Sequence, residues 1–339
     1  MARRVIVTLL GLVFIALIAY GAFGMRYSVA TTDSGVVDPP APAITVRDLD
    51  VGQGDATYIH NGDSRVIIDG GPDARRMGHL LDSLGLNKTT IDVVILTHQH
   101  SDHYTGLLPL FDSRRRIRIR YFFENKDPAA ASTLARLRDS ILARVDRDSL
   151  QYRDTDDPCG DGTSICSITL RGSAVLHIMR PMPEPTKVNN RSAAVKIVGA
   201  DSASFTMWLA GDAEHGEIAY FETAGYARNP GMRVNVLKAD HHGSCNGVTP
   251  RYLDLTQPSW VVASLGAKND YGHMHTQAKA EYRAASIPWY RTDQNGTVTI
   301  RSAGMPDSGY TITPSRSGSD RNGPSDRRAS ARGCASNVD

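Results

Sequence analysis

Apolar positions along the chain fall into short runs that predict strands and helices in alternation. Ile44–Leu49 alternates between two faces, as a half-buried strand does. Ile91–Leu96 is almost continuously apolar, which is typical of a strand buried on both faces of a sheet. Between them, the apolar residues of Ala74–Leu84 recur at helical spacing.

The same alternation continues towards the C-terminus. Further strands are expected at Arg65–Ile68, Arg118–Phe123, Thr206–Ala210, Val234–Lys238, Trp260–Ser264 and Thr297–Ile300, and further helices at Ala129–Val145, Glu214–Thr223 and Thr276–Ala285. We find no repeat of fixed period in the chain. The fold class is therefore predicted to be α/β.

The N-terminus carries a targeting signal. Arg3 and Arg4 precede the uncharged run Val5–Met25, which orients the N-terminus towards the cytoplasm and sends the following chain across the membrane. A span requires about 20 apolar residues, so the run is just long enough. We expect residues 1–30 to be either a cleaved signal peptide or an N-terminal membrane anchor. The rest should be exported, and either membrane-anchored or secreted.

Composition sets the remaining boundaries. Residues 31–43 resemble a linker, residues 44–314 form the predicted domain, and 315–339 should be a disordered tail, since large apolar residues nearly vanish there. The formal net charge of +2 does not favour nucleic acid or an acidic partner. Cys159 and Cys166 could form a disulfide in an oxidising compartment, whereas Cys245 and Cys334 have no evident partners.

A cluster of potential metal ligands follows the strand Ile91–Leu96. Within the segment Thr97–His103, alternate residues of an extended chain share a side, so His98 and His100 can bind one ion. A turn would then direct Asp102 and His103 to a second position. Imidazole and carboxylate ligands suit zinc, and also manganese or iron.

Two later segments can complete a two-metal centre. Asp212 follows the strand Thr206–Ala210 and is the expected bridging carboxylate. His241 and His242 follow another strand, and one of them should complete the second metal site. We favour His241 because it is nearer to the strand end, with His242 facing substrate; the reverse assignment stays open.

The order of these motifs resembles the metallo-β-lactamase superfamily. Asp50-Val51-Gly52-Gln53-Gly54-Asp55-Ala56 and His241-His242-Gly243-Ser244 are similar to the metallo-hydrolase domain of ComEC-type DNA-uptake proteins. The resemblance implies an αββα sandwich with two divalent ions, zinc or alternatively manganese, at one edge of the sheets. It also implies that Asp69 orients the metal-binding loop without touching the ions.

The chain departs from the superfamily pattern at one ligand. Many members have a histidine between the cluster and the bridging aspartate, where this chain has Asn189-Asn190-Arg191-Ser192, as ComEC-like proteins do. The first metal site therefore has fewer evident ligands, and His177 is an alternative donor. The resemblance also suggests that the pair His273 and His275 lies near the mouth of the site, where we expect His275 to contact substrate.

A basic row offers a second contact surface. Arg116, Arg118 and Arg120 share one face of an expected strand. Such a row could bind a phosphate-rich substrate, nucleic acid included. Alternatively, it is a solvated edge strand on which charge discourages aggregation.

These observations predict a metal-dependent hydrolase. Metal coordination lowers the pKa of bound water from about 15.7 to near 7, so a metal-bound hydroxide could attack phosphorus or carbonyl carbon. Asp102 and Asp212 are the expected catalytic carboxylates. Phosphoester hydrolysis, of nuclease or phosphodiesterase type, is the first expectation. Hydrolysis of carboxylic ester, lactone or β-lactam bonds is the second, and a membrane-anchored DNA-binding module with a vestigial site is the third.

Overall fold

A computed structural model describes residues 43–128, 131–148, 150–200, 205–303 and 309–317. All of them belong to the unit of the chain that begins at Pro40. The expected signal or anchor, nearly all of the linker and the tail beyond residue 317 lie outside these residues. Within the described ranges, no helix combines the length and apolar character needed to cross a membrane.

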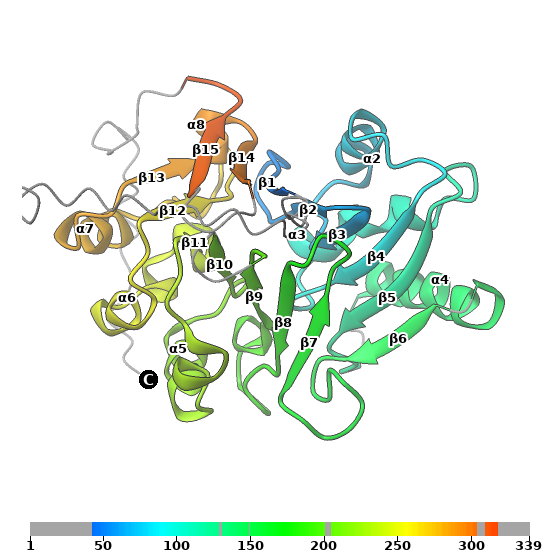
Figure 1. The fold of residues 1–339 in the computed structure, drawn as a ribbon, viewed down its shortest axis with the longest axis horizontal. Coiled ribbons are helices and arrows are strands. Elements are labelled where there is room, and N and C mark those ends of the chain that lie inside the picture. The colour runs from blue at the N-terminus through cyan, green and yellow to red at the C-terminus, as the bar shows by residue number, and fades with distance from the viewer. Residues whose placement is uncertain (1–42, 129–130, 149, 201–204, 304–308, 318–339) are drawn as a thin grey trace, which may run out of the picture. The chain divides into compact units, whose positions relative to one another are not determined.

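Within the described residues the strands form two sheets (Figure 1). The first sheet contains, in spatial order, β15 (Tyr310–Pro314), β14 (Val298–Ser302), β1 (Ile44–Asp48), β2 (Thr57–Asn61), β3 (Ser64–Ile68), β4 (Thr90–Ile95), β5 (Arg118–Glu124) and β6 (Gln151–Asp154). The second contains β13 (Trp289–Arg291), β12 (Trp260–Ala263), β11 (Val236–Lys238), β10 (Thr206–Leu209), β9 (Ala194–Val198), β8 (Val175–Met179) and β7 (Ile165–Thr169).

The helices cover the outer faces of the two sheets. They are α2 (Ala74–Ser83), α3 (Ser101–Tyr104), α4 (Ser132–Asp148), α5 (His215–Thr223), α6 (Pro250–Thr256), α7 (Thr276–Ala284) and α8 (Thr292–Asn295). Apolar residues of α2 and α4 pack on the first sheet, and those of α5, α6 and α7 pack on the second. The layers therefore run helix, sheet, sheet, helix.

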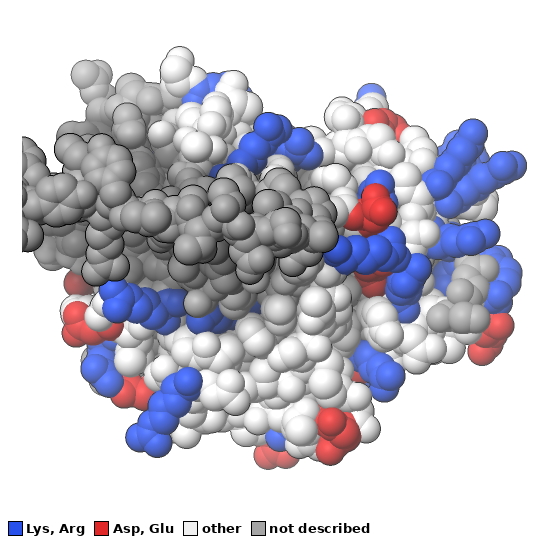
Figure 2. All heavy atoms as spheres, viewed as in Figure 1, with Lys and Arg blue, Asp and Glu red and all other residues white. Residues whose placement is uncertain are grey.

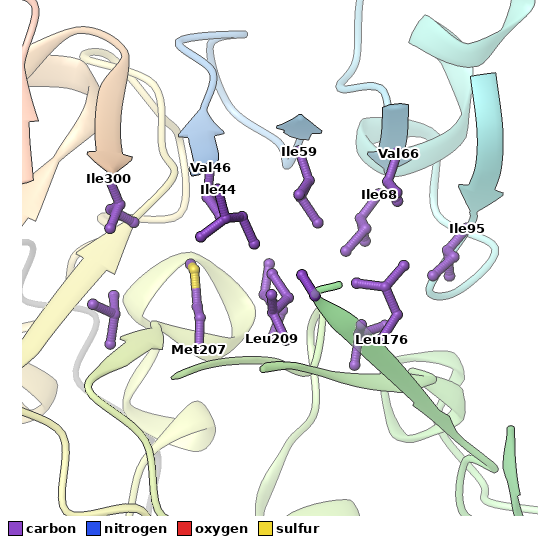
Figure 3. Close-up of a cluster of buried hydrophobic side chains, with 14 of the residues drawn as sticks. Ile44, Val46, Ile59, Val66, Ile68, Ile95, Leu176, Met207, Leu209 and Ile300 are labelled. Carbon is purple, nitrogen blue, oxygen red and sulfur yellow. The ribbon is translucent and has the colours of Figure 1, made fainter. Parts of the chain in front are cut away.

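The inner faces of the sheets meet in an apolar core. Figure 3 shows Val46 and Ile95 of the first sheet facing Leu176, Met207 and Leu209 of the second. Because successive side chains of a strand point to opposite faces, β3 and β4 contribute both to this core and to the layer beneath the helices. The expected αββα sandwich is confirmed.

The direction of the strands places several polar loops at one edge. β3, β4 and β5 run parallel in the first sheet, as do β10, β11, β12 and β13 in the second. In α/β sheets, ligands bind beyond the carboxyl ends of such strands. The His98–His103 segment follows β4, and Asp212, His241 and His242 follow strands β10 and β11.

The predicted elements agree with the structure within a few residues, but the prediction did not include the individual strands β2, β6, β7, β8, β9, β13 and β15. β15 pairs with β14 beyond the expected last strand, because Tyr310 and Ile312 pack against the inter-sheet core. Cys159 and Cys166 form the expected disulfide, with Cα atoms 5.0 Å apart. Cys245 is also disulfide-bonded, so the expectation that it lacks a partner is wrong. Cys334 lies outside the described residues.

Candidate metal centre

His98, His100 and Asp212 form the first group of metal-binding side chains. Nε2 of His98 lies 3.0 Å from Nδ1 of His100 and 3.8 Å from Oδ2 of Asp212. One ligand atom of each residue lies within 4.8 Å of the others. These three side chains can therefore hold one ion between the ends of β4 and β10.

Asp102, His103 and His242 form a second group with the same Asp212. Nε2 of His103 is 3.2 Å from Oδ1 of Asp212. Nε2 of His242 is 3.2 Å from Oδ2 of Asp102 and 3.4 Å from Oδ2 of Asp212. Asp212 thus belongs to both groups, which is the geometry that a bridging carboxylate requires.

The donor atoms of both groups fit divalent cations. The buried Oδ1 of Asp212 and Nε2 of His103 lie 3.2 Å apart but make no well-aligned hydrogen bond to each other or to another described residue, although buried polar atoms normally have one. Burial raises the pKa of Asp212, but the neighbouring His242 and His103 outweigh it and hold that pKa well below its usual value. Burial also lowers the pKa of His98, which favours its neutral, metal-binding form. The nitrogen and carboxylate ligands suit zinc or manganese.

Asp69 fixes the orientation of the metal-binding loop and of His103 without being one of the potential ligands. Its Oδ1 accepts a hydrogen bond from the backbone N–H of Thr97 at 2.8 Å, and its Oδ2 accepts one from Thr97 Oγ1 at 2.8 Å. The same Oδ2 lies 2.9 Å from Nδ1 of His103. With the proton of His103 held on Nδ1, the lone pair of Nε2 faces Asp212. This is the role that the family resemblance implies for Asp69.

The geometry favours His242, and not His241, as the ligand after β11. Nδ1 of His242 is held by Asp55 at 3.1 Å, and its Nε2 points towards the other ligands. The ring of His241 lies further out, with Nε2 3.8 Å from Asp212 and Nδ1 3.5 Å from Glu214. The preference for His241 rested on its position nearer to the strand end. Both residues adopt a left-handed turn, with φ of 47° and 54°, which directs the second histidine inward.

His275 does not take the expected substrate-facing position. Its Nδ1 accepts the backbone N–H of Cys245 at 3.1 Å, and its Nε2 donates to the carbonyl of Tyr271 at 3.1 Å. Both ring nitrogens are thus used to hold the loop together. His273 lines the cavity beside the metal-binding groups instead. Burial and the neighbouring His242 lower the pKa of His273 to about 2, so this ring is neutral.

The cavity at this edge has a volume of about 400 Å³. It is lined by Gln53, His100, Ser101, Asp102, Asn189, Asp212, His241, His242, Tyr271 and His273. All of these side chains are polar. The site can therefore bind a small polar group against the two metal-binding groups.

A family model for the metallo-beta-lactamase superfamily matches residues 49–154, which include Asp69 and the His98–His103 segment. Residues 49–154, about a third of the chain, therefore form a metallo-β-lactamase segment. This confirms the prediction of a metal-dependent hydrolase at the level of the superfamily. The metallo-β-lactamase segment ends at the last residue of β6. The other potential metal ligands, Asp212 and His242, come later in the chain.

One curated relative is ComE operon protein 3 of Bacillus subtilis (strain 168), which is 26% identical over 279 residues. The alignment covers 75% of this chain and 32% of the relative, so the chain spans about a third of that protein's length. The expected likeness to ComEC-type proteins is thereby confirmed.

Solved structures with a similar fold were also found. The metallo-beta-lactamase fold protein YhfI of Bacillus subtilis has a TM-score of 0.47 and 13% identity, covering 79% of this chain and 99% of its own. A diphosphatase of the PhnP family has a TM-score of 0.40 and 13% identity, covering 65% and 85% of the two chains. The short form of human tRNase Z has a TM-score of 0.39 and 14% identity, covering 64% and 91%.

The position of the missing superfamily histidine is occupied by Asn189, which lines the cavity. Its Nδ2 donates to Glu214 at 2.9 Å, whereas its buried Oδ1 accepts no hydrogen bond within the described part of the chain. His177 is not a substitute donor. It lies on β8, where its Nδ1 is 2.8 Å from the hydroxyl of Ser167.

The basic row of Arg116, Arg118 and Arg120 lies away from the metal centre. Arg118 pairs with Thr90 at the beginning of β4, whereas His98 follows the other end of this strand, about 20 Å further on. β5 also lies between β4 and β6, so the alternative of an edge strand is wrong. Arg120 is 3.4 Å from Asp92. Figure 2 shows Lys and Arg side chains gathered on this side of the described unit.

Several residues of the site were not predicted as such. Asp55, Gln53 and Lys238 support the site from loops and strand ends that are distant in sequence. The Asp50–Ala56 segment contains the first two and was noted only for its family resemblance. That resemblance was the signal that could have identified Asp55 and Gln53 as residues of the site.

Proposed function

We propose that this chain is a two-metal phosphoesterase of nuclease or phosphodiesterase type. The observation that carries the proposal is the polar cavity beside the two metal-binding groups. Its lining includes Gln53 and the neutral His273, both of which can donate hydrogen bonds to the oxygens of a phosphoryl group. Among the described residues of this lining, Tyr271 supplies the only large hydrophobic side chain, and aliphatic side chains that would select a hydrophobic acyl group are lacking.

The ion positions follow from the two groups described above. His98, His100 and Asp212 would hold one ion, and Asp102, His103, His242 and Asp212 the other. Two divalent ions, with zinc favoured and manganese as the alternative, would activate water and stabilise the charge of a displacement at phosphorus.

The residues of the chain itself have separate roles in this proposal. Asp212 would contribute a ligand to both metal sites, and Asp69 keeps His103 in the orientation needed for binding. His273 and Gln53 orient the phosphoryl oxygens in the cavity. Orientation of the reacting group is itself a large contribution to catalysis.

An assay of the purified full chain tests the substrate class. The substrates are bis-p-nitrophenyl phosphate, p-nitrophenyl phosphate, single-stranded DNA, p-nitrophenyl acetate and nitrocefin, each with zinc, with manganese and with chelator. We expect metal-dependent turnover of a phosphodiester, with Asp212→Asn as the inactive control. Turnover of nitrocefin or the acetate alone would replace the proposal by carboxylic ester or β-lactam hydrolysis. Binding of DNA without turnover of any substrate would favour a binding module.

We further propose that the domain is exported. The support is the Arg3-Arg4 pair before the apolar run Val5–Met25, together with the Cys159–Cys166 disulfide, since disulfides persist mainly in oxidising compartments. A reporter enzyme that is active only outside the cytoplasm, fused after Asp339, should be active. Activity of a cytoplasm-only reporter at the same position would contradict this topology.

A further inference from the structure

A buried ion pair joins the two sheets behind the metal centre. Nζ of Lys238 lies 2.7 Å from Oδ2 of Asp55, and their side chains are only 2% and 5% exposed. Lys238 ends β11 of the second sheet, whereas Asp55 lies between β1 and β2 of the first. The pair therefore fixes the position of the Asp50–Ala56 segment relative to the loop that carries His242.

The same segment packs directly on the metal-binding loop. The backbone N–H of Asp55 donates to the carbonyl of Asp102 at 3.2 Å. Gly54 makes this approach feasible, because a Cβ at this position would collide with that carbonyl oxygen, and its φ of 151° disfavours other residues. Asp55 is thus held from two sides, by Lys238 and by the Asp102 backbone.

The other oxygen of Asp55 holds His242. Oδ1 lies 3.1 Å from Nδ1 of His242, which is also 3.0 Å from the carbonyl of Ser264. Both neighbours are acceptors, so Nδ1 carries a proton, and Nε2 is the nitrogen that would bind an ion shared with Asp102 and Asp212. A carboxylate in this position fixes the orientation of a metal-binding imidazole and increases its basicity.

We propose that Asp55, held by Lys238, is a positioning residue that makes the group of Asp102, His103, Asp212 and His242 the tighter of the two metal sites. This inference rests on the metal-binding part of the proposed function and is independent of the substrate.

The two groups differ in the support that their histidines receive. In the tighter group, His103 is backed by Asp69 and His242 by Asp55, and both carboxylates are buried. In the other group, the hydroxyl of Thr97, at 3.3 Å, is the only partner of His98 Nδ1 among the described residues. That group also offers three side chains instead of four, one of which is the shared Asp212.

Lys238 explains how a buried Asp55 keeps its charge. Nζ of Lys238, which is buried together with Asp55 and lies 2.7 Å from its Oδ2, supplies the positive charge that balances this carboxylate in the protein interior. A carboxylate is the stronger acceptor for the imidazole N–H. Loss of Lys238 should therefore weaken metal binding through Asp55 and not by a contact of its own.

The test is a metal titration of the full chain. Metal-free protein is titrated with zinc in competition with a chromogenic chelator. The wild type should bind one ion tightly and a second more weakly, and His98→Ala should lose only the weaker step. Asp55→Asn should weaken the tight step by about 10–100-fold. Lys238→Met should act in the same direction, and the double variant should be no weaker than Asp55→Asn alone, because both act through one contact.

Asp92→Asn is the matched control. Asp92 is also a largely buried carboxylate paired with a cation, Arg171, at 2.9 Å, but it is not part of the metal centre. This variant should leave both zinc affinities unchanged. In the zinc-loaded wild type, nitrogen-edited NMR should show a hydrogen-bonded Nδ1 proton on His242, and this signal should shift in Asp55→Asn.

Two results would overturn the inference. In the first, Asp55→Asn lowers the melting temperature of the metal-free protein but leaves both affinities within twofold, so that the pair is structural only. In the second, the His242 proton is found on Nε2. Wild-type protein that binds no metal would instead contradict the two-metal centre as a whole, whereas failure to hydrolyse phosphoesters would leave the titration result intact.

Discussion

Gln53 and His273 face each other at the cavity, with Nε2 of Gln53 3.4 Å from Nδ1 of His273. The orientation of the Gln53 amide is set by Gly266, whose backbone N–H donates to Oε1 at 3.0 Å. The amide nitrogen therefore faces His273, whose Nδ1 must act as acceptor. The proton of the neutral ring is then on Nε2, which makes no hydrogen bond to any described residue. His273 is thus prepared to donate to a bound oxygen.

Replacement of His273 should weaken substrate binding without removing the metals. We expect His273→Ala to raise KM for the phosphodiester by about tenfold or more, which corresponds to the loss of about 1.4 kcal/mol. The measurement is steady-state kinetics with metal content determined in parallel. An unchanged KM with full metal occupancy would contradict a contact between His273 and substrate.

His275→Ala is the matched comparison for His273→Ala, and it should act on stability instead. This substitution leaves the buried N–H of Cys245 and the carbonyl of Tyr271 without their partner. An unsatisfied buried group of this kind costs about 1–3 kcal/mol. The melting temperature should fall, while KM of the remaining folded protein stays near the wild-type value.

Asp212 should be the most sensitive single position for activity. Its two oxygens face both ligand groups, so Asp212→Ala should reduce occupancy at both metal sites and abolish turnover. His98→Ala should reduce occupancy mainly at one. Circular dichroism must show both variants folded. If folded Asp212→Ala retained more than about a tenth of the wild-type rate, a loss below about 1.4 kcal/mol, the bridging role would be wrong.

The first ligand cluster and the bridging aspartate could be located from the sequence because each directly follows an apolar strand. Parallel strands bring their carboxyl ends to one edge, so Asp102 and Asp212 meet there although they lie in different sheets. Local spacing also sufficed for His98 and His100, which are two residues apart at the end of β4.

The choice between neighbouring histidines could not be made from the sequence. It depends on backbone conformation at His241 and His242, whose positive φ values reverse the expected order. For His273 and His275 it depends on which ring accepts the hydrogen bond from the backbone N–H of Cys245. Such contacts are tertiary, and strand periodicity does not encode them.

The buried residues that hold the metal ligands in place could not be predicted from the sequence, for a similar reason. Asp55 and His242 are 187 residues apart and meet only because the two sheets pack face to face. Neither the composition nor the local pattern around Asp55 indicates this partner. The segment was conspicuous only through its likeness to a family.

Removal of the Cys159–Cys166 disulfide should affect stability and not activity. The two cysteines are seven residues apart, and their bond closes the short loop that leads into β7. The bond contacts no ligand of the metal centre. Chain entropy for a loop of this length gives a stabilisation of about 2 kcal/mol. The Cys159→Ser/Cys166→Ser variant should therefore unfold at lower denaturant concentration with unchanged kcat. A variant that lost activity before it lost structure would indicate a link to the site that the contacts do not contain.

The last prediction concerns Asp48, a buried carboxylate behind the metal centre. Its Oδ1 accepts a hydrogen bond from the hydroxyl of Ser264 at 2.7 Å, and its Oδ2 has no partner among the described residues. Burial raises the pKa of Asp48 from 3.8 to about 6, even though Lys238 acts in the opposite direction. The folded protein therefore holds this proton more tightly than the unfolded chain does.

The sign of the pH dependence follows from that difference. Below about pH 4 the carboxyl is protonated in both states and its titration has no net effect. Between about pH 4 and pH 6 the unfolded state loses the proton first, so the folded state becomes progressively less stable, by up to about 3 kcal/mol in total. Asp48→Asn cannot titrate and still accepts from Ser264. Its stability relative to the wild type should therefore rise across this window and level off above about pH 7.

Denaturant unfolding of metal-free wild type and Asp48→Asn at several pH values measures this difference. Both proteins are kept in chelator, so that protonation of the metal ligands contributes equally and cancels. The pH dependence of the difference is the test, because the amide itself can shift stability by a constant amount. A difference that stays flat from pH 4 to pH 7 would show that Asp48 titrates alike in the two states, and one that falls would show that its charged form is stabilised by Lys238 more than burial opposes it.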